Sequence, residues 1–288
     1  MPSFTIETEH GLTSVTDTGL KNDKPALLLI HGNSSSSKIF RHILESPTLT
    51  SKYRVVAFDL PGHGASSNAP DPERSYWMRG YADLALYILQ HLNIARVVVF
   101  GWSLGGHVGI EMVNLLASSS PVIQLDGLLI TGTPPALGAD QLDHAFSFED
   151  GGLNLAGKKD WTDEETEGFA RHCVAAAAGA ESLFEPWMLE DAKRTDGRAR
   201  MVMSRKISTG EGVDQRHVVE TADVLIAVVN GGDEPFVNLD YLDDIHWKKL
   251  WKNECVRLPG LKHAPFWERP NDFERILLEF LTDCADQA

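Results

Sequence analysis

A short apolar run that passes directly into a glycine-flanked serine constrains the fold more than any other part of the chain. Residues 97–100 read Val-Val-Val-Phe, which suits a buried strand, and residues 101–105 read Gly-Trp-Ser-Leu-Gly. Apolar residues then recur at helical spacing from Val108 onward. A strand, a tight turn with a serine and a helix form the context of a nucleophile elbow. We therefore predict that Ser103 lies on a strained turn, with the amide of Leu104 at a helix N-terminus.

Other apolar runs of strand length are spread along the chain. They lie at residues 26–30, 54–58, 128–131, 225–229 and 255–258, and two shorter candidates, 4–7 and 12–15, flank a turn at His10-Gly11. Helical patterns cover residues 78–92 and 271–281. Continuous apolar runs that alternate with helices predict an α/β fold with a mostly parallel central sheet flanked by helices.

One long segment has no strand pattern. Between residues 133 and 222 the sequence instead contains helix-like pieces, at 162–178, 181–194 and 197–207. We predict a core domain of residues 1–132 and 223–288 and an inserted helical cap of residues 133–222. The expected substrate-binding residues combine apolar cap side chains with two from the body: Trp102, Phe169, Trp187, Met188 and Phe236. The alternative for each ring is that it only packs the cap against the body.

Composition excludes several classes of partner. The formal net charge of −15 argues against nucleic acid and anionic membrane surfaces. Cys173, Cys255 and Cys284 are odd in number and far apart, which suits a reducing compartment rather than a disulfide framework. The first ten residues lack the apolar core of a signal peptide, and no run approaches the length of a membrane span. We therefore expect a cytoplasmic protein. We also expect no metal and no other cofactor, and no metal-binding motif is present.

A serine nucleophile needs a histidine base that is held by a carboxylate. In a parallel sheet both should come from loops at the carboxyl ends of strands. The loop after residues 225–229 contains Asp233 and Glu234, and the loop after residues 255–258 contains His263. We predict His263 as the base. Asp233 and Glu234 both follow the appropriate strand, so either could be the carboxylate that holds it.

An oxyanion hole requires two backbone N–H donors. One is expected from Leu104, and the other from Asn33, which follows His31-Gly32 at the end of a strand. The serines at 34–37 would let backbone approach a ligand closely, although an exposed flexible loop is the alternative. His31 and His63 precede glycines at strand ends, and we expect them to fix turns by hydrogen bonding.

With these residues in view, the chain resembles the metal-independent N-acyl-homoserine lactone lactonases of the α/β-hydrolase superfamily. The motifs that carry the resemblance are His-Gly-Asn-Ser-Ser-Ser at 31–36, Thr-Gly-Thr-Pro-Pro at 131–135, Arg-Thr-Asp-Gly-Arg-Ala-Arg at 194–200, and the stretches 228–237 and 260–266. The resemblance implies hydrolytic opening of a lactone ring under a helical cap, with apolar cap residues over the acyl chain. It departs from the family pattern at Phe169, where that pattern has a tyrosine and therefore a polar contact to the ligand.

The resemblance also bears on the acid and on the substrate. In this fold the acid usually lies three residues after the loop glycine, which from Gly231 favours Glu234 over Asp233. The expected partner is a small-molecule ester or lactone, and the expected state is a monomer or homodimer. A generic carboxylesterase, a ligand receptor built on a hydrolase fold, and a cofactor-free oxygenase or lyase stay open. Serine at position 103 argues against dehalogenase or epoxide hydrolase chemistry, which needs a carboxylate nucleophile.

Overall fold

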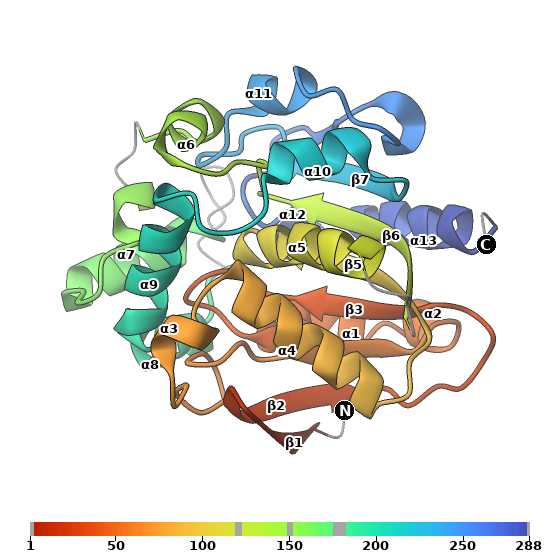
Figure 1. The fold of residues 1–288 in the computed structure, drawn as a ribbon, viewed down its shortest axis with the longest axis horizontal. Coiled ribbons are helices and arrows are strands. Elements are labelled where there is room, and N and C mark those ends of the chain that lie inside the picture. The colour runs from red at the N-terminus through yellow and green to blue at the C-terminus, as the bar shows by residue number, and fades with distance from the viewer. Residues whose placement is uncertain (1–2, 119–122, 149–151, 175–182, 287–288) are drawn as a thin grey trace.

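A single twisted sheet forms the centre of the molecule (Figure 1). The computed structural model describes residues 3–118, 123–148, 152–174 and 183–286. Within them the strand order is β1-β2-β4-β3-β5-β6-β7-β8. The strands are β1 (Ser3–Thr8), β2 (Gly11–Asp17), β3 (Ala26–Ile30), β4 (Val55–Phe58), β5 (Arg96–Trp102), β6 (Gln124–Thr131), β7 (Leu225–Gly231) and β8 (Val256–Leu258). The β1–β2 and β2–β4 pairs are antiparallel and all later pairs are parallel, which confirms the expected mostly parallel sheet.

Helices cover both faces of this sheet, as expected for a parallel sheet with apolar strands. Successive residues of a strand point to opposite faces. Leu28 and Val99 belong to the core that includes α4 and α5, whereas Leu29 and Phe100 belong to the core that includes α13. The helices of the body are α1 (Arg41–Leu44), α2 (Pro47–Thr50), α3 (Pro72–Ser75), α4 (Met78–His91), α5 (Leu104–Ser118), α11 (Leu239–Asp243), α12 (Pro265–Glu268) and α13 (Pro270–Asp286), with short 3-10 turns η1 (Ser37–Phe40) and η4 (Trp251–Asn253).

The described elements of the segment between β6 and β7 are helices joined by loops, with one isolated bridge between Phe146 and Val237. Its elements are α6 (Ala139–Ala145), η2 (Gly152–Leu155), α7 (Asp163–His172), α8 (Pro186–Arg194), α9 (Gly197–Ser208) and α10 (Gln215–Thr221). Helices α7, α8 and α9 gather at one end of the sheet in Figure 1. Helix α10 packs against α5 of the body. Of the expected helix 162–178, residues 175–178 lie outside the described residues, and the division into core and cap domains stays a prediction.

The register of the central strands brings the carboxyl ends of β3, β5 and β6 to the same edge of the sheet. Ile30 of β3 pairs with Gly101 of β5, and Trp102 of β5 pairs with Thr131 of β6. Because these strands are parallel, the loops that follow them emerge side by side. No described helix is long and apolar enough to cross a membrane.

Candidate active site

The turn between β5 and α5 is strained in the way that the sequence predicts. Ser103 has a φ of 54°, in the left-handed region that non-glycine residues rarely adopt. A side chain at Gly101 would overlap the backbone of Gly105, and a side chain at Gly105 would overlap the carbonyl of Ile30. The Ser103 amide donates to the Thr131 carbonyl at 2.7 Å. These close backbone approaches hold the serine at the carboxyl edge of the sheet.

His263 and Glu234 form a buried pair beside this turn. The imidazole Nδ1 lies 2.8 Å from Glu234 Oε1 and 2.9 Å from Oε2. The imidazole is 4% exposed and the carboxylate is fully buried. The amide of Phe236 also donates to Glu234 Oε1, at 2.9 Å, which fixes the carboxylate from a second side. Asp233 is exposed instead, so the structure brings Glu234 and not Asp233 to the histidine.

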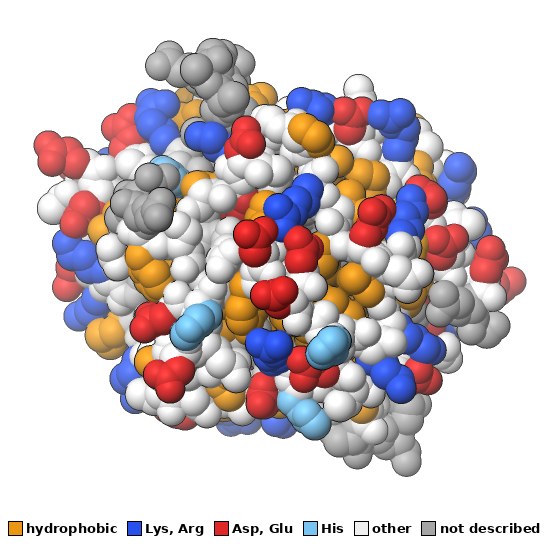
Figure 2. All heavy atoms as spheres, turned by 90° about the horizontal axis from the view of Figure 1, so that it is seen from above, with side chains coloured by type: hydrophobic (Ala, Val, Ile, Leu, Met, Phe, Trp, Pro, Cys, Tyr) orange, Lys and Arg blue, Asp and Glu red, His pale blue; other side chains and the backbone are white. Residues whose placement is uncertain are grey.

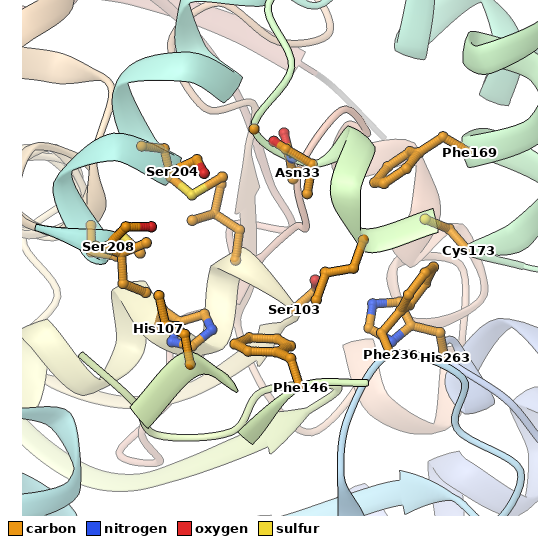
Figure 3. A pocket seen from close by; sticks show the side chains of 18 of the residues that line it. Asn33, Ser103, His107, Phe146, Phe169, Cys173, Ser204, Ser208, Phe236 and His263 are labelled. Carbon is orange, nitrogen blue, oxygen red and sulfur yellow. The ribbon is translucent and has the colours of Figure 1, made fainter. Parts of the chain in front are cut away.

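The imidazole of His263 is held by several groups around it. Trp102 donates its indole N–H to the His263 carbonyl at 2.9 Å, and the two rings lie 5.5 Å apart. Phe236 meets the imidazole edge-on, with ring centroids 4.8 Å apart. Gly132 leaves room for the ring, because a Cβ there would lie 2.5 Å from His263 Cε1. In Figure 3 the imidazole lies beside Ser103, partly behind the ring of Phe236.

Ser103 and His263 open onto one cavity of about 170 Å³. Asn33, Leu104, Trp102, Phe169 and Phe236 line it as well, together with side chains of α6 and α9, so most of the expected site residues meet there (Figure 3). A neighbouring hollow of about 20 Å³ is lined by Phe169 and Met188.

Trp187 is not among the described residues that line this cavity, and its expected role in substrate binding stays a prediction. Its indole N–H donates to Glu185 at 2.6 Å, and its ring packs edge-on against Trp267 at a centroid distance of 5.6 Å. Residue 187 therefore faces α12 of the body rather than the space above Ser103. The contacts of Trp187 fit the alternative given for these rings, which is packing against the body.

The loop after β3 is held by residues of the segment between β6 and β7. The Asn33 side-chain amide donates to the Ala156 carbonyl at 2.9 Å, and Arg200 Nη1 donates to the Ser34 hydroxyl at 3.3 Å. Ser36 hydrogen-bonds to Asp191 of α8. All of these side chains except that of Ala156 belong to buried residues, so the alternative of an exposed serine loop does not hold. Asn33 thus lines the cavity from a fixed loop, as does Leu104, the first residue of α5.

His31 and His63 fix turns, as expected. The Leu60 amide donates to His31 Nε2 at 2.9 Å, and His63 Nδ1 lies 3.0 Å from the Pro61 carbonyl. Burial lowers the pKa of His63 to about 3. Neither imidazole lines the cavity that contains Ser103.

Several residues that line the cavity were not anticipated. They are Met78, His107, Leu142, Phe146, Phe148, Leu153, Ala156, Gly157, Cys173, Met203, Ser204, Ile207 and Ser208. His107 had a detectable signal, because it lies in the first turn of the helix that follows Ser103. Burial raises the pKa of the Cys173 thiol, which keeps it in its weakly nucleophilic protonated form. Within the described residues no group of three or more histidine, cysteine, aspartate or glutamate side chains could hold a metal ion.

Comparisons with known proteins place this chain in a family. A profile described as the alpha/beta hydrolase family matches residues 27–276. The chain belongs to the alpha/beta hydrolase family. This alpha/beta hydrolase is similar to the crystal structure of the N-acyl homoserine lactonase AidH in complex with N-butanoyl homoserine, with 42% identity and a TM-score of 0.90 over 99% of this chain and 97% of that one. A variant of AidH in complex with N-hexanoyl homoserine lactone is 41% identical, with a TM-score of 0.90 over 99% of both chains.

Curated relatives of this alpha/beta hydrolase are more distant or match it only in part. A pimeloyl-[acyl-carrier protein] methyl ester esterase of Nitrosomonas europaea is 24% identical over 251 residues, which cover 86% of this chain and 92% of that protein. The magnesium-chelatase 30 kDa subunit of Rhodobacter capsulatus is 36% identical over 114 residues, and the match spans only 40% of this chain and 37% of that protein. The expected resemblance to this hydrolase superfamily and to its lactonases is thus confirmed.

Proposed function

We propose that this alpha/beta hydrolase opens a lactone ring by nucleophilic catalysis at Ser103, with an N-acyl-homoserine lactone or a similar apolar-tailed lactone as substrate. The observation that carries the proposal is the buried His263–Glu234 pair on the wall of the cavity that contains Ser103. Similarity to AidH, whose structures hold N-butanoyl homoserine and N-hexanoyl homoserine lactone, supports the choice of substrate.

Acylation is the first half of the proposed reaction. His263 Nε2 removes the proton from Ser103 as the serine oxygen attacks the ring carbonyl carbon. Glu234 accepts a hydrogen bond from Nδ1, so it fixes the tautomer that leaves Nε2 unprotonated and stabilises the imidazolium that forms. The ring C–O bond then breaks, and the departing alkoxide takes the proton from His263. The acyl group stays on Ser103, and the new hydroxyl stays attached to that acyl group.

Deacylation repeats these proton transfers with water. His263 removes a proton from a water molecule that attacks the ester carbon, and Ser103 leaves with that proton. The product is the ring-opened hydroxy acid, one water heavier than the substrate, with the acyl side chain intact.

The negative charge on the carbonyl oxygen needs donors in both halves. The first proposed donor is the amide of Leu104, which is the first residue of α5. At this end of a helix the N–H groups have no intrahelical partner, and the helix dipole favours an anion. The amide of Asn33 is the second proposed donor. Each such donor typically supplies about 3 kcal/mol of transition-state stabilisation. The hydrogen bond from the Asn33 side chain to the cap, described above, keeps its backbone in place.

The apolar walls of the cavity suit an acyl chain. Phe146, Phe169, Met203 and Ile207 line it, and burying one methylene group contributes about 0.8 kcal/mol. We expect activity to rise with acyl length until the cavity is filled. Such a substrate contains a ring ester and a side-chain amide. The ester bond is easier to hydrolyse, since the nitrogen of an amide must be protonated as it departs.

A lactone and ester panel followed by mass spectrometry tests the proposal. We expect a product one water heavier than the lactone, and a loss of about 10⁶-fold in kcat for Ser103→Ala because triad members act as a unit. A fluorophosphonate probe should label the wild type and not this variant. Turnover retained in Ser103→Ala refutes the nucleophile, and release of free homoserine lactone with a fatty acid would identify an acylase instead.

A generic carboxylesterase is the second candidate. The similarity to the pimeloyl-[acyl-carrier protein] methyl ester esterase, over most of both chains, favours it. The same panel separates the two, because turnover of methyl and aryl esters with no turnover of any lactone would support this candidate.

A further inference from the structure

Among the residues that the structure describes, the space beside Ser103 is unequal in its two directions. The hollow past Phe169, toward Met188, has a volume of only about 20 Å³, close to the minimum that one water molecule requires. The rest of the cavity extends over α5 and α9, between Met203, Ile207 and Phe146. The larger space open to an acyl chain bound at Ser103 therefore lies along α5.

This route passes a buried polar side chain. His107 lies on α5, one turn beyond Ser103, and lines the cavity with only 5% of its surface exposed. Its Nδ1 lies 2.6 Å from the Oε1 atom of Gln215 on α10. In Figure 3 His107 lies on the side of the cavity away from Phe169 and Cys173, with Ser208 and Ser204 of α9 on the same side.

The hydrogen bond to Gln215 determines what His107 offers to a ligand. Burial lowers the pKa of His107 to about 4, so its ring is neutral at pH 7. An amide oxygen only accepts hydrogen bonds, so the Nδ1 that faces it carries the proton. Nε2, on the other side of the ring, is then an acceptor without a proton. A neutral imidazole in this tautomer favours a hydroxyl over a carbonyl, because only the hydroxyl can donate to Nε2.

The spacing along α5 indicates where on the substrate such a hydroxyl would lie. Four residues of helix rise by about 6 Å. An extended chain covers about 3.3–3.6 Å for every three bonds, so this distance corresponds to about five bonds. In an N-acyl amino lactone, five bonds from the ring carbonyl carbon lead through the α-carbon, the nitrogen and the amide carbon to the third carbon of the acyl chain.

We infer that His107 is a specificity-determining residue that selects lactones with a hydroxyl group on the third carbon of the acyl chain. The inference rests on the proposed function, since it assumes that the ring carbonyl binds at Ser103. The hydroxyl donates to Nε2 of His107, in an arm of the cavity that Phe146, Met203 and Ile207 line together with two serines of α9.

The test compares three N-acyl-homoserine lactones of equal chain length, which differ at the third acyl carbon by a methylene, a carbonyl or a hydroxyl group. For the wild type we expect kcat/KM to be about tenfold higher for the hydroxyl compound than for the other two, the gain typical of one neutral hydrogen bond. His107→Phe keeps a ring of similar size without an acceptor, and should reduce this ratio to about one. His217→Phe makes the same substitution at an exposed position of α10 and should leave the ratio unchanged.

Each outcome has a separate meaning. If the wild type does not prefer the hydroxyl compound, the inference is overturned. This result needs no variant, so it can be obtained even if His107→Phe fails to fold. An equal loss on all three substrates in His107→Phe means that the residue only joins α5 to α10, which also overturns it. Since the ratio compares substrates within one preparation, a smaller folded fraction does not alter it. No turnover of any lactone would instead refute the proposed function itself.

Discussion

Replacement of Gly132 by alanine should separate catalysis from stability in this protein. Gly132 follows β6 and has a φ of 64°. An added Cβ would lie 2.5 Å from Cε1 and 2.8 Å from Nδ1 of His263. Non-bonded carbon atoms pack at about 3.5–4.0 Å, so the imidazole would have to move by about 1 Å.

The expected magnitudes follow from this displacement. A misplacement of about 1 Å in a catalytic group can cost about 100-fold in rate, equivalent to about 2.7 kcal/mol in the activation free energy. An alanine at positive φ costs about 1–2 kcal/mol of backbone strain. We therefore expect kcat on a lactone substrate to fall about 100-fold, while denaturant titration shows a free energy of unfolding lower by only about 1–2 kcal/mol.

Gly138 provides the matched control. Its φ is 80°, and a Cβ added there meets no atom within 4 Å. Gly138→Ala introduces comparable backbone strain without contact to the imidazole, so its kcat should stay within about threefold of the wild type. The reasoning is refuted if Gly132→Ala retains wild-type kcat, or if Gly138→Ala loses as much activity.

Three further perturbations test the site and its supports. Glu234→Gln should lower kcat about 10⁴-fold in steady-state assays, while Asp233→Asn changes it little; the reverse order would reassign the acid. Burial lowers the pKa of His63 to about 3 and of His107 to about 4, both from 6.5. Between pH 6.5 and 4 the unfolded chain therefore binds more protons than the native one, and the free energy of unfolding should fall with decreasing pH, by up to about 1.4 kcal/mol per histidine per pH unit. Urea titrations at pH 7, 5.5 and 4.5 measure this, and equal values would contradict it. Arg200→Gln leaves a serine hydroxyl and two backbone carbonyls without their buried donor, so it should lower the free energy of unfolding by about 2–4 kcal/mol, and an unchanged melting temperature would argue against this role.

The strands could be predicted from the sequence because each is a continuous apolar run in a sheet that is covered on both faces. The least accurate boundary was that of β6, expected from residue 128 but observed from Gln124. Its first residues are polar or only partly buried, and Asp126 pairs with Arg96 of the neighbouring strand. Apolar patterning cannot reveal strand residues whose hydrogen-bonding partners compensate for their polarity.

The geometry around Ser103 was also largely predictable, because it depends on strand ends. The preference for Glu234 over Asp233 came from counting residues in one loop, and Glu234 is the acid that contacts the imidazole. The contacts of Trp187 with Glu185 and Trp267 could not be predicted, because the rotation of α8 depends on packing, which apolar content alone does not specify. His107 lines the cavity from a helix and not from a strand end, so the position of strand ends does not predict it.

The insertion of α6 to α10 between β6 and β7 has a consequence for biosynthesis. At synthesis rates of about 5–20 residues per second, the ribosome needs roughly 5–20 s to produce the roughly 90 residues between these two strands. During that interval the nascent chain has six strands and an uncovered edge at β6, which can pair with another chain. The serine and the loop after β3 also emerge well before the histidine and the glutamate. The nascent chain is therefore most exposed to aggregation while α6 to α10 are being translated, and Ser103, Glu234 and His263 are all present only after β8.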